Sequence, residues 1–272
     1  EVFVLLHGYG ASSFSWRRWV PHLTGRGHVV LVDLKGFGAA PRPDDGRYAP
    51  TDQAELVHRL LAQRGLTGVT LIGHSMGGGV ALITALRLID EGAGRLRRLV
   101  IVAGAAYRQR LPPFMLLARF RRQSMAALRA LGPRIVAGQV LRSIVYDTGS
   151  VTADQIEGYA AGLSGPEAHR VLIDTALQLL PHDLDAITAR YREIDVPTLL
   201  MWGSHDRVVP LAVARRLARE IPRASMKIVR RCGHLPAEEW PDSTAAQLLA
   251  FVDRTAPSLS AVPHTRHLEE QS

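Results

Sequence analysis

The sequence predicts an α/β fold with a mostly parallel sheet and helices on both of its faces. Short, continuous apolar runs, which are typical of buried parallel strands, alternate with stretches of helical period. The connections between them are short and rich in Gly, Pro and Asp, which end strands and begin helices. Alternation of this kind predicts a sheet covered on both sides.

Length and composition agree with a globular α/β protein. The 272 residues suffice for one large domain or a domain with an inserted cap, and a hydrophobic content of 47% supplies a full core. The formal net charge is +8, and Lys35 and Lys227 are the only lysines among the basic residues. Because no nucleic-acid-binding motif accompanies this charge, we expect a solvated surface and no nucleic-acid partner. One cluster of arginines stands out: Arg108, Arg110, Arg119, Arg121, Arg122, Arg129, Arg134 and Arg142.

Cysteine usage and the lack of long apolar runs bear on the compartment. Cys232 is the only cysteine, so no internal disulfide can form, which is typical of a reducing compartment. No apolar run is long enough to cross a bilayer, and no signal peptide is evident, although residue 1 is Glu. We therefore expect a cytoplasmic protein without an integral membrane segment.

The first part of the chain alternates strands and helices. Strands are expected at 2–6, 28–32, 69–72 and 98–102. Ser12 or Ser13 is a candidate cap for a helix that Pro21 would shorten or break. A second helix is expected from a cap at Thr51 or Asp52 to about residue 65, and a third follows residue 75.

The alternation stops between residues 107 and 183, where the pattern is helical. Its apolar positions form one face opposite several arginines. They are Leu117, Phe120, Ala127, Leu128 and Leu131. We expect a helical cap over the carboxyl edge of the sheet.

The strand–helix alternation then resumes. Helices are expected at 183–192, 211–220 and 244–253, and strands at 196–202 and 225–229. The predicted organisation is a core of residues 1–106 and 184–256, a cap of 107–183, and a flexible carboxyl-terminal tail of 257–272.

One motif organises the site. Four strand-type residues lead into Gly73-His74-Ser75-Met76-Gly77, and a small apolar helix follows. A strand, a sharp turn and a helix in this order form a nucleophile elbow, which pushes the serine hydroxyl out of the sheet. Gly73 and Gly77 avoid a Cβ where the neighbouring strand or helix would collide with it.

An activated serine needs a base, and the base needs an orienting carboxylate. Asp206 follows the strand at 196–202, and His234 follows the last strand. Carboxyl ends of parallel strands meet at one edge of a sheet, so these side chains can converge on Ser75. The order Ser, Asp, His is the one that accompanies the elbow. His7 and His74 lie in glycine-rich turns, where we expect them to hold loops by hydrogen bonds.

These stretches together resemble the α/β-hydrolase superfamily, and in particular its cap-bearing serine hydrolase branch. The matching residues are 7–10, 33–38, 73–78, 203–210 and 233–234, which span nearly the whole chain. The resemblance implies an α/β-hydrolase fold and a role for each matching residue. Ser75 would be the nucleophile, His234 the general base and then acid, and Asp206 the orienting acid. The backbone N–H groups of Tyr9 and Met76 would form the oxyanion hole.

The expected activity is hydrolysis of a small or medium ester, or a related acyl bond, through an acyl-enzyme, as in a carboxylesterase. Two alternatives on the same triad are a carbon–carbon bond hydrolase of ring-fission products and a perhydrolase. Leu235 counts against the first, because that subfamily usually carries Trp after the catalytic histidine. A ligand-binding, receptor-like protein is an alternative of another class. No cofactor or metal is expected, and the partner is a small-molecule substrate.

The strand at 28–32 raises one further expectation. Capped hydrolases of this kind usually have two strands before the one that carries His7-Gly8, and one of them would pair with residues 28–32. Without it, an apolar sheet edge lacks a partner. The sequence therefore predicts either a fragment of a longer chain or a homodimer that covers this edge.

Overall fold

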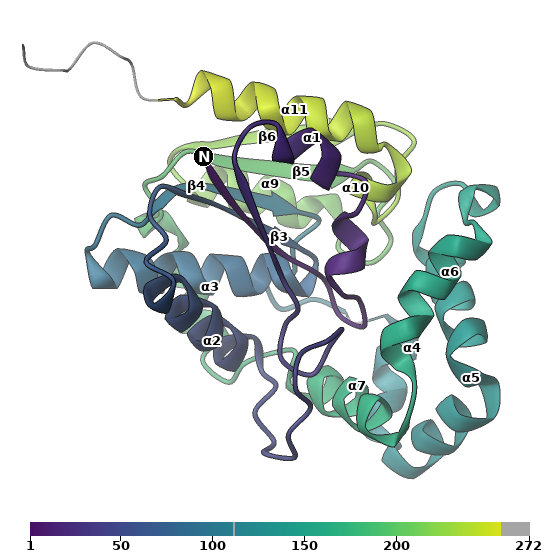
Figure 1. The fold of residues 1–272 in the computed structure, drawn as a ribbon. Helices are drawn as coiled ribbons and strands as arrows, with labels where there is room; N and C mark the ends of the chain where they lie inside the picture. The colour runs from purple at the N-terminus through teal and green to yellow at the C-terminus, as the bar shows by residue number, and fades with distance from the viewer. Residues whose placement is uncertain (111, 257–272) are drawn as a thin grey trace, which may run out of the picture.

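The structure, a computed structural model, describes residues 1–110 and 112–256. In these residues the chain forms one parallel sheet of order β2-β1-β3-β4-β5-β6, with helices on both faces (Figure 1). The predicted α/β fold class is therefore confirmed. The strands are β1 (Val2–Leu6), β2 (His28–Val32), β3 (Val69–His74), β4 (Leu96–Val102), β5 (Thr198–Gly203) and β6 (Ala224–Val229).

The apolar runs of the sequence form the inner strands. Every residue of β3 and of β5 is buried, as expected for parallel strands with helices on both sides. The edge strands β2 and β6 are partly exposed, and Leu31 of β2 is 39% exposed. Among the described residues, β2 pairs only with β1. The predicted fragment or dimer stays a prediction.

Two apolar cores lie on the two faces of the sheet. Helices α2 (Pro50–Gln63), α3 (Met76–Glu91) and α9 (Leu211–Glu220) pack on one face. Helices α1 (Val20–Thr24), α10 (Pro236–Glu239) and α11 (Pro241–Arg254) pack on the other, where Trp16 and Trp19 are almost fully buried. Figure 1 shows α2 and α3 on the side of the sheet opposite α1 and α11. The inner strands β1, β3, β4 and β5 therefore lie between two apolar layers.

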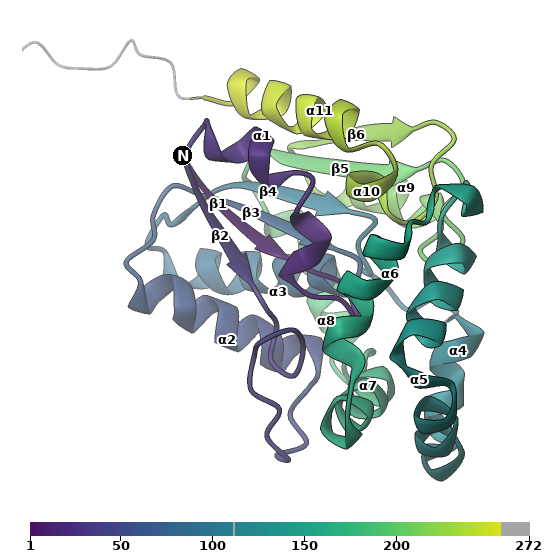
Figure 2. The ribbon, with the colours of Figure 1, turned by 45° about the vertical axis from the view of Figure 1, so that its right-hand side comes forward.

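The helices between β4 and β5 form a separate group, which we call the helical insertion (107–183). It contains α4 (Pro113–Leu116), α5 (Arg121–Ile144), α6 (Ala153–Ala160) and α7 (Pro166–Gln178), and α8 (Leu184–Ala189) follows it. Figure 2 shows these helices standing beside the carboxyl ends of the strands. Helix α5 bends at Gly132, whose φ of 75° and ψ of 160° are not helical, and Pro133 follows the bend.

Several element bounds differ from the sequence predictions. A 3₁₀ helix at Ser13–Trp16 and the short helix α1 replace one helix, and Pro21 lies in the first turn of α1, where its missing N–H costs nothing. Helix α2 begins at Pro50, so Thr51 is not its cap. The Asp52 carboxylate instead accepts a hydrogen bond from the Ala49 N–H (3.2 Å).

The predicted apolar face of the insertion is only partly buried. Leu117, Phe120 and Leu131 are 58%, 60% and 44% exposed. Leu117 lies in a 3₁₀ turn and Phe120 lies between that turn and α5, so these positions do not belong to one continuous helical face. The predicted tail of 257–272 lies outside the described residues. Within the described part of the chain, no helix combines the length and apolarity needed to cross a bilayer.

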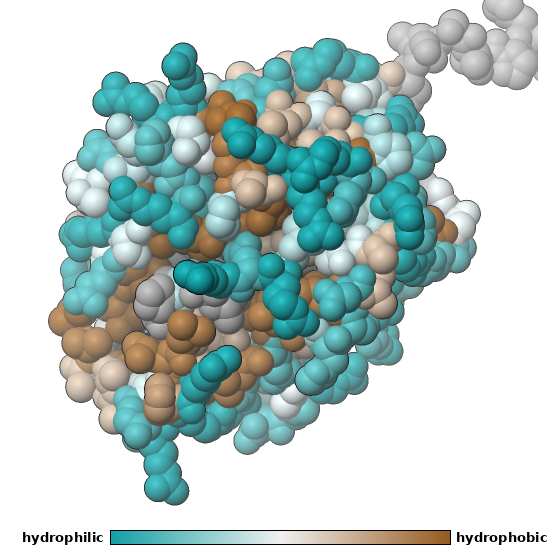
Figure 3. All heavy atoms as spheres, turned by 180° about the vertical axis from the view of Figure 1, so that it is seen from behind, coloured by the Kyte–Doolittle hydropathy of each residue, from teal (hydrophilic) through white to brown (hydrophobic). Residues whose placement is uncertain are grey.

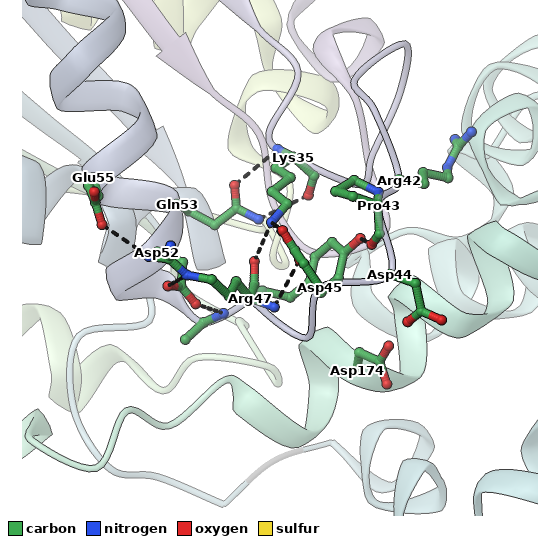
Figure 4. A network of polar contacts seen from close by, with 12 residues as sticks. Lys35, Arg42, Pro43, Asp44, Asp45, Arg47, Asp52, Gln53, Glu55 and Asp174 are labelled. Atoms are coloured by element: carbon green, nitrogen blue, oxygen red, sulfur yellow. Dashed lines mark hydrogen bonds and ion pairs between the residues drawn. The ribbon is translucent and has the colours of Figure 1, made fainter.

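The loop between β2 and α2 fastens the insertion to the core (Figure 4). Lys35 Nζ donates to the Asp45 carboxylate (2.7 and 2.8 Å), and the Lys35 backbone exchanges two hydrogen bonds with the Gln53 amide. From α7, Arg170 pairs with Asp44 (3.1 Å) and donates to the carbonyl oxygen of Arg42 (2.7 Å). The Lys35 contacts order the loop, and the two Arg170 contacts hold α7 against it.

Candidate active site

Ser75 stands in a strained turn between β3 and α3. Its φ of 52° and ψ of −119° are rare for a residue with a Cβ, and such a conformation persists only where the surroundings enforce it. Four backbone hydrogen bonds do so. The Ser75 N–H donates to Val102 O (3.0 Å), and the Ser75 carbonyl oxygen accepts from the N–H groups of Gly78 (2.9 Å), Gly79 (3.3 Å) and Ala105 (2.9 Å).

Two glycines let the chain pass through this turn. A Cβ built at Gly73 would lie 2.2 Å from the Gly77 carbonyl oxygen, and one at Gly77 would lie 2.4 Å from His7 O. Both obstacles are backbone atoms, one in α3 and one directly after β1, which cannot move aside without displacing these elements. The absence of side chains therefore allows the amino-terminal end of α3 to pack directly against β1 and β3.

The His234 ring is the hydrogen-bond partner of the Ser75 hydroxyl group. Its Nε2 is 2.9 Å from Ser75 Oγ, and its ring is almost fully buried. The His234 N–H donates to Ile144 O (2.8 Å) at the end of α5, and its carbonyl oxygen accepts from His74 Nε2 (2.8 Å). The core and the insertion thus both hold the loop that carries His234.

Asp206 completes the chain of hydrogen bonds. Its Oδ2 lies 2.8 Å from His234 Nδ1, and its Oδ1 accepts from the N–H groups of Val208 (2.8 Å) and Val209 (3.0 Å). The Asp206 carboxylate is acceptor-only, so His234 Nδ1 carries the proton. In the neutral ring Nε2 is then unprotonated and accepts from the Ser75 hydroxyl group.

Two further histidines hold the surrounding loops. Burial lowers the pKa of His74 to about 3, so its ring is neutral. Burial also lowers the pKa of His7, whose Nδ1 donates to Gly8 O and whose Nε2 accepts from the Leu34 N–H (2.9 Å). Both rings act through hydrogen bonds to loop backbone, as the sequence analysis expects.

The backbone N–H groups of Tyr9 and Met76 are available at the site. Met76 is the first residue of α3, and Tyr9 follows β1 by three residues. Among the described residues, no hydrogen bond from either N–H is found. Tyr9 lines the same cavity as Ser75. Because the first N–H groups of a helix have no partner within it, the start of α3 can stabilise negative charge beside Ser75.

A cavity of about 300 Å³ opens on Ser75 and His234. The core contributes the loop of residues 8–11, and the insertion contributes most of the rest from α4, α5, α6 and α7. Its lining is largely apolar, and no Lys, Arg, Asp or Glu among the described residues contributes to it. The polar lining residues are Tyr9, His74, Ser75, Ser124, Gln139, Tyr159 and His234.

Tyr159 is a lining residue that the sequence analysis missed. Its hydroxyl group donates to Glu238 Oε1 (3.0 Å), and Glu238 also pairs with Arg17 (2.5 Å). Burial, reinforced by the Glu238 charge, holds the pKa of Tyr159 well above its ordinary value. Tyr159 and Glu238 are 79 residues apart, so no local pattern could have shown the contact.

Metal-ligating side chains do not gather in the described part of the chain. No group of three or more His, Cys, Asp or Glu side chains in residues 1–110 and 112–256 has an arrangement that could hold a metal ion. Cys232 is buried, and burial raises the pKa of its thiol.

Comparison with known proteins places the chain in a family. A family model described as "Alpha/beta hydrolase family" matches residues 3–247. Among solved structures, an alpha/beta hydrolase fold protein from Burkholderia ambifaria has a TM-score of 0.79 and is 26% identical, with 91% of this chain and 89% of that chain covered.

Two curated relatives carry different names. The magnesium-chelatase 30 kDa subunit of Rhodobacter capsulatus is 29% identical over 262 residues, which cover 93% of this chain and 87% of the relative. The 2-hydroxy-6-oxononadienedioate/2-hydroxy-6-oxononatrienedioate hydrolase of Cupriavidus pinatubonensis is 29% identical over 245 residues, which cover 86% and 80%.

Proposed function

Because this chain belongs to the alpha/beta hydrolase family, whose model matches residues 3–247, we propose that it is a serine hydrolase that cleaves esters through an acyl-enzyme. Ser75 is the nucleophile, His234 the general base and then acid, and Asp206 the residue that orients the imidazole. One observation carries the proposal: a continuous chain of hydrogen bonds from Asp206 through His234 to Ser75, which ends in an apolar cavity.

The geometry supports a two-step reaction. His234 Nε2 takes the proton from Ser75 Oγ as the oxygen attacks the acyl carbon, and it returns the proton to the leaving alcohol. The N–H groups of Tyr9 and Met76 stabilise the oxyanion, and each donor of this type contributes about 2.7–4 kcal/mol. Water then attacks the acyl-enzyme, again through His234.

The cavity favours an uncharged acyl group. Its described lining contains no cationic side chain, so a carboxylate bound there would lose its hydration without gaining an ion pair. Apolar side chains from α5 and α7 instead offer contact to an alkyl or aryl chain. A volume of about 300 Å³ is at the small end of ligand pockets, which suits a short or medium acyl chain.

A carbon–carbon bond hydrolase is the second candidate. The relative from Cupriavidus pinatubonensis favours it, since its name states hydrolysis of a dienedioate or a trienedioate. A dienedioate carries two carboxylates, and the cavity offers no described arginine or lysine to pair with them. Leu235, rather than Trp, follows His234 in the lining. We therefore favour the ester.

The helical insertion acts as a cap in this proposal, with residues 107–183 on a core of 1–106 and 184–256. It supplies the acyl pocket, since α5 and α7 line much of the cavity. Its attachment to the core through Arg170 and Ile144 keeps the pocket over Ser75.

A substrate panel tests the proposal. Turnover of p-nitrophenyl esters should show an optimum in kcat/KM at about four to eight acyl carbons, as the small cavity implies. A hydroxy-oxo-dienoate should be cleaved far more slowly under the same conditions. Faster cleavage of the dienoate than of every ester would show that the protein is a carbon–carbon bond hydrolase. Turnover of neither substrate class would contradict both candidate functions.

A further inference from the structure

The positive charge of this chain is concentrated in one segment. Residues 107–146 contain eight arginines and no Asp, Glu or Lys, and the remaining 25 basic residues are matched by 25 acidic ones. The entire formal net charge of +8 therefore resides in α4, α5 and their connections. A merely arginine-rich composition would spread this excess over the whole surface.

These arginines are exposed, and most are free of acidic partners. All eight are exposed, and only Arg121 and Arg134 pair with a described carboxylate, namely Asp174 and Glu157. Arg119, Arg122 and Arg129 form no ion pair within the described part of the chain. Guanidinium groups in this state are available to bind phosphate oxygens.

Large apolar side chains lie among the arginines. Leu117, Phe120 and Leu131 are 58%, 60% and 44% exposed. Leu116 at the end of α4 and Ile135 in α5 are 42% and 51% exposed. Figure 3 shows a hydrophobic area at its lower left, where α4 and α5 lie, with hydrophilic side chains across and around it. We call these five apolar residues, together with the arginines of residues 107–146, the α4–α5 surface.

The α4–α5 surface adjoins the mouth of the catalytic cavity. Leu117 and Leu131 are both exposed to solvent and part of the cavity lining. A partner bound to this surface would therefore lie next to the entrance that leads to Ser75.

We propose that the α4–α5 surface binds peripherally to an anionic phospholipid bilayer. Exposed Leu and Phe side chains enter the boundary between headgroups and acyl chains, while arginines neutralise the phosphates, which is how basic amphipathic helices lie on membranes. A flat anionic surface matches a segment with eight cations and no acid. A second copy of the chain would instead bring two such positive surfaces together.

Vesicle binding tests the inference separately from the proposed function. The Ser75→Ala variant is mixed with vesicles of phosphatidylcholine, with or without phosphatidylglycerol, and sedimented. The expected result is binding that requires phosphatidylglycerol and weakens as salt shortens the screening length from about 10 Å at 0.1 M to about 3 Å at 1 M.

Two sets of variants locate the surface. Replacing Arg119, Arg122 and Arg129 together by Gln should lower the partition coefficient on the order of 100-fold, since each basic residue near an anionic surface contributes about five-fold. Phe120→Ser, which removes an exposed side chain outside the cavity lining, should lower it about ten-fold.

The matched control replaces exposed arginines elsewhere. Arg64, Arg219 and Arg223 lie outside the α4–α5 surface, and none forms an ion pair among the described residues. Their joint change to Gln removes the same charge and should leave partitioning within about three-fold. If both triple variants lost the same fraction of vesicle binding, net charge alone would explain the binding, and the inference would be overturned.

Two other outcomes would also overturn it. One is a lack of binding to anionic vesicles. The other is a dimer in sedimentation velocity that Phe120→Ser converts to a monomer, because a second copy would then cover the surface. Turnover of a water-soluble ester by the wild-type protein is measured in parallel. An absence of ester turnover would contradict the proposed function and would not affect the conclusion on membrane binding.

Discussion

The Asp206→Asn variant should remove the orienting role of Asp206 while keeping its hydrogen bonds to the surrounding backbone. Oδ1 of Asp206 accepts from the N–H groups of Val208 and Val209. These donors fix the orientation of the new amide, because only its oxygen can accept from them. The amide nitrogen then occupies the place of Oδ2 and donates to His234 Nδ1, 2.8 Å away in the wild-type protein.

The consequence is the wrong tautomer of His234. With Nδ1 as an acceptor, the ring proton moves to Nε2, which then donates to Ser75 Oγ instead of accepting from it. Loss of the base in this way lowers kcat about 10⁴-fold in a serine protease triad. We expect a loss of the same order here, which corresponds to about 5.4 kcal/mol of transition-state stabilisation.

The assay is kcat and KM for p-nitrophenyl butanoate, with the melting temperature measured in parallel. KM should change little, since Asp206 does not line the cavity. The control is His205→Asn in the same loop, because the His205 ring contacts Ser204 and Tyr146, and no hydrogen bond among the described residues joins it to His234. That variant should keep near wild-type turnover. If Asp206→Asn kept kcat within about ten-fold of wild type, the orienting role would be refuted.

Three further predictions test the packing around the site. Gly77→Ala should lower the free energy of unfolding by more than about 3 kcal/mol in urea, because the new Cβ meets backbone oxygens at 2.4 and 2.5 Å; near-wild-type stability would contradict this packing. His74, with a pKa of about 3 folded against 6.5 unfolded, binds more protons when unfolded, so stability should fall as pH drops below 6.5. Between about pH 8 and about pH 5 that fall should be about 2 kcal/mol smaller in His74→Gln, and an unchanged pH profile would exclude His74 as its source. Ala137→Phe should lower kcat/KM for octanoyl esters at least about ten-fold and leave acetyl esters nearly unaffected, since Ala137 lines the cavity; equal losses for both would show that it does not bound the acyl chain.

The residues brought together at Ser75 could be predicted because each follows a strand with a local signal. The turn residues at Ser75 identify the end of β3, and Asp206 and His234 follow the ends of β5 and β6. Parallel strands place such ends at one edge, so position along the chain predicts proximity in space. The roles themselves rest on resemblance and stay proposals.

The packing of the insertion could not be predicted in the same way. The amphipathic pattern of Leu117, Phe120 and Leu131 identifies an apolar face but not what covers it, and these side chains are substantially exposed. Contacts between distant segments, such as that of Tyr159 with Glu238, leave no local pattern either. They depend on how the insertion docks on the core.

Covalent labelling by a fluorophosphonate tests most directly whether Ser75 is the catalytic nucleophile. This probe phosphonylates an activated serine, and peptide mass spectrometry identifies the modified residue. We expect one adduct per chain, on Ser75, that forms in parallel with the loss of ester turnover. Ser75→Ala should neither react nor turn over ester, while keeping the wild-type melting temperature. An adduct on another residue, or a Ser75→Ala protein that retains more than a few per cent of the activity, would contradict the central claim.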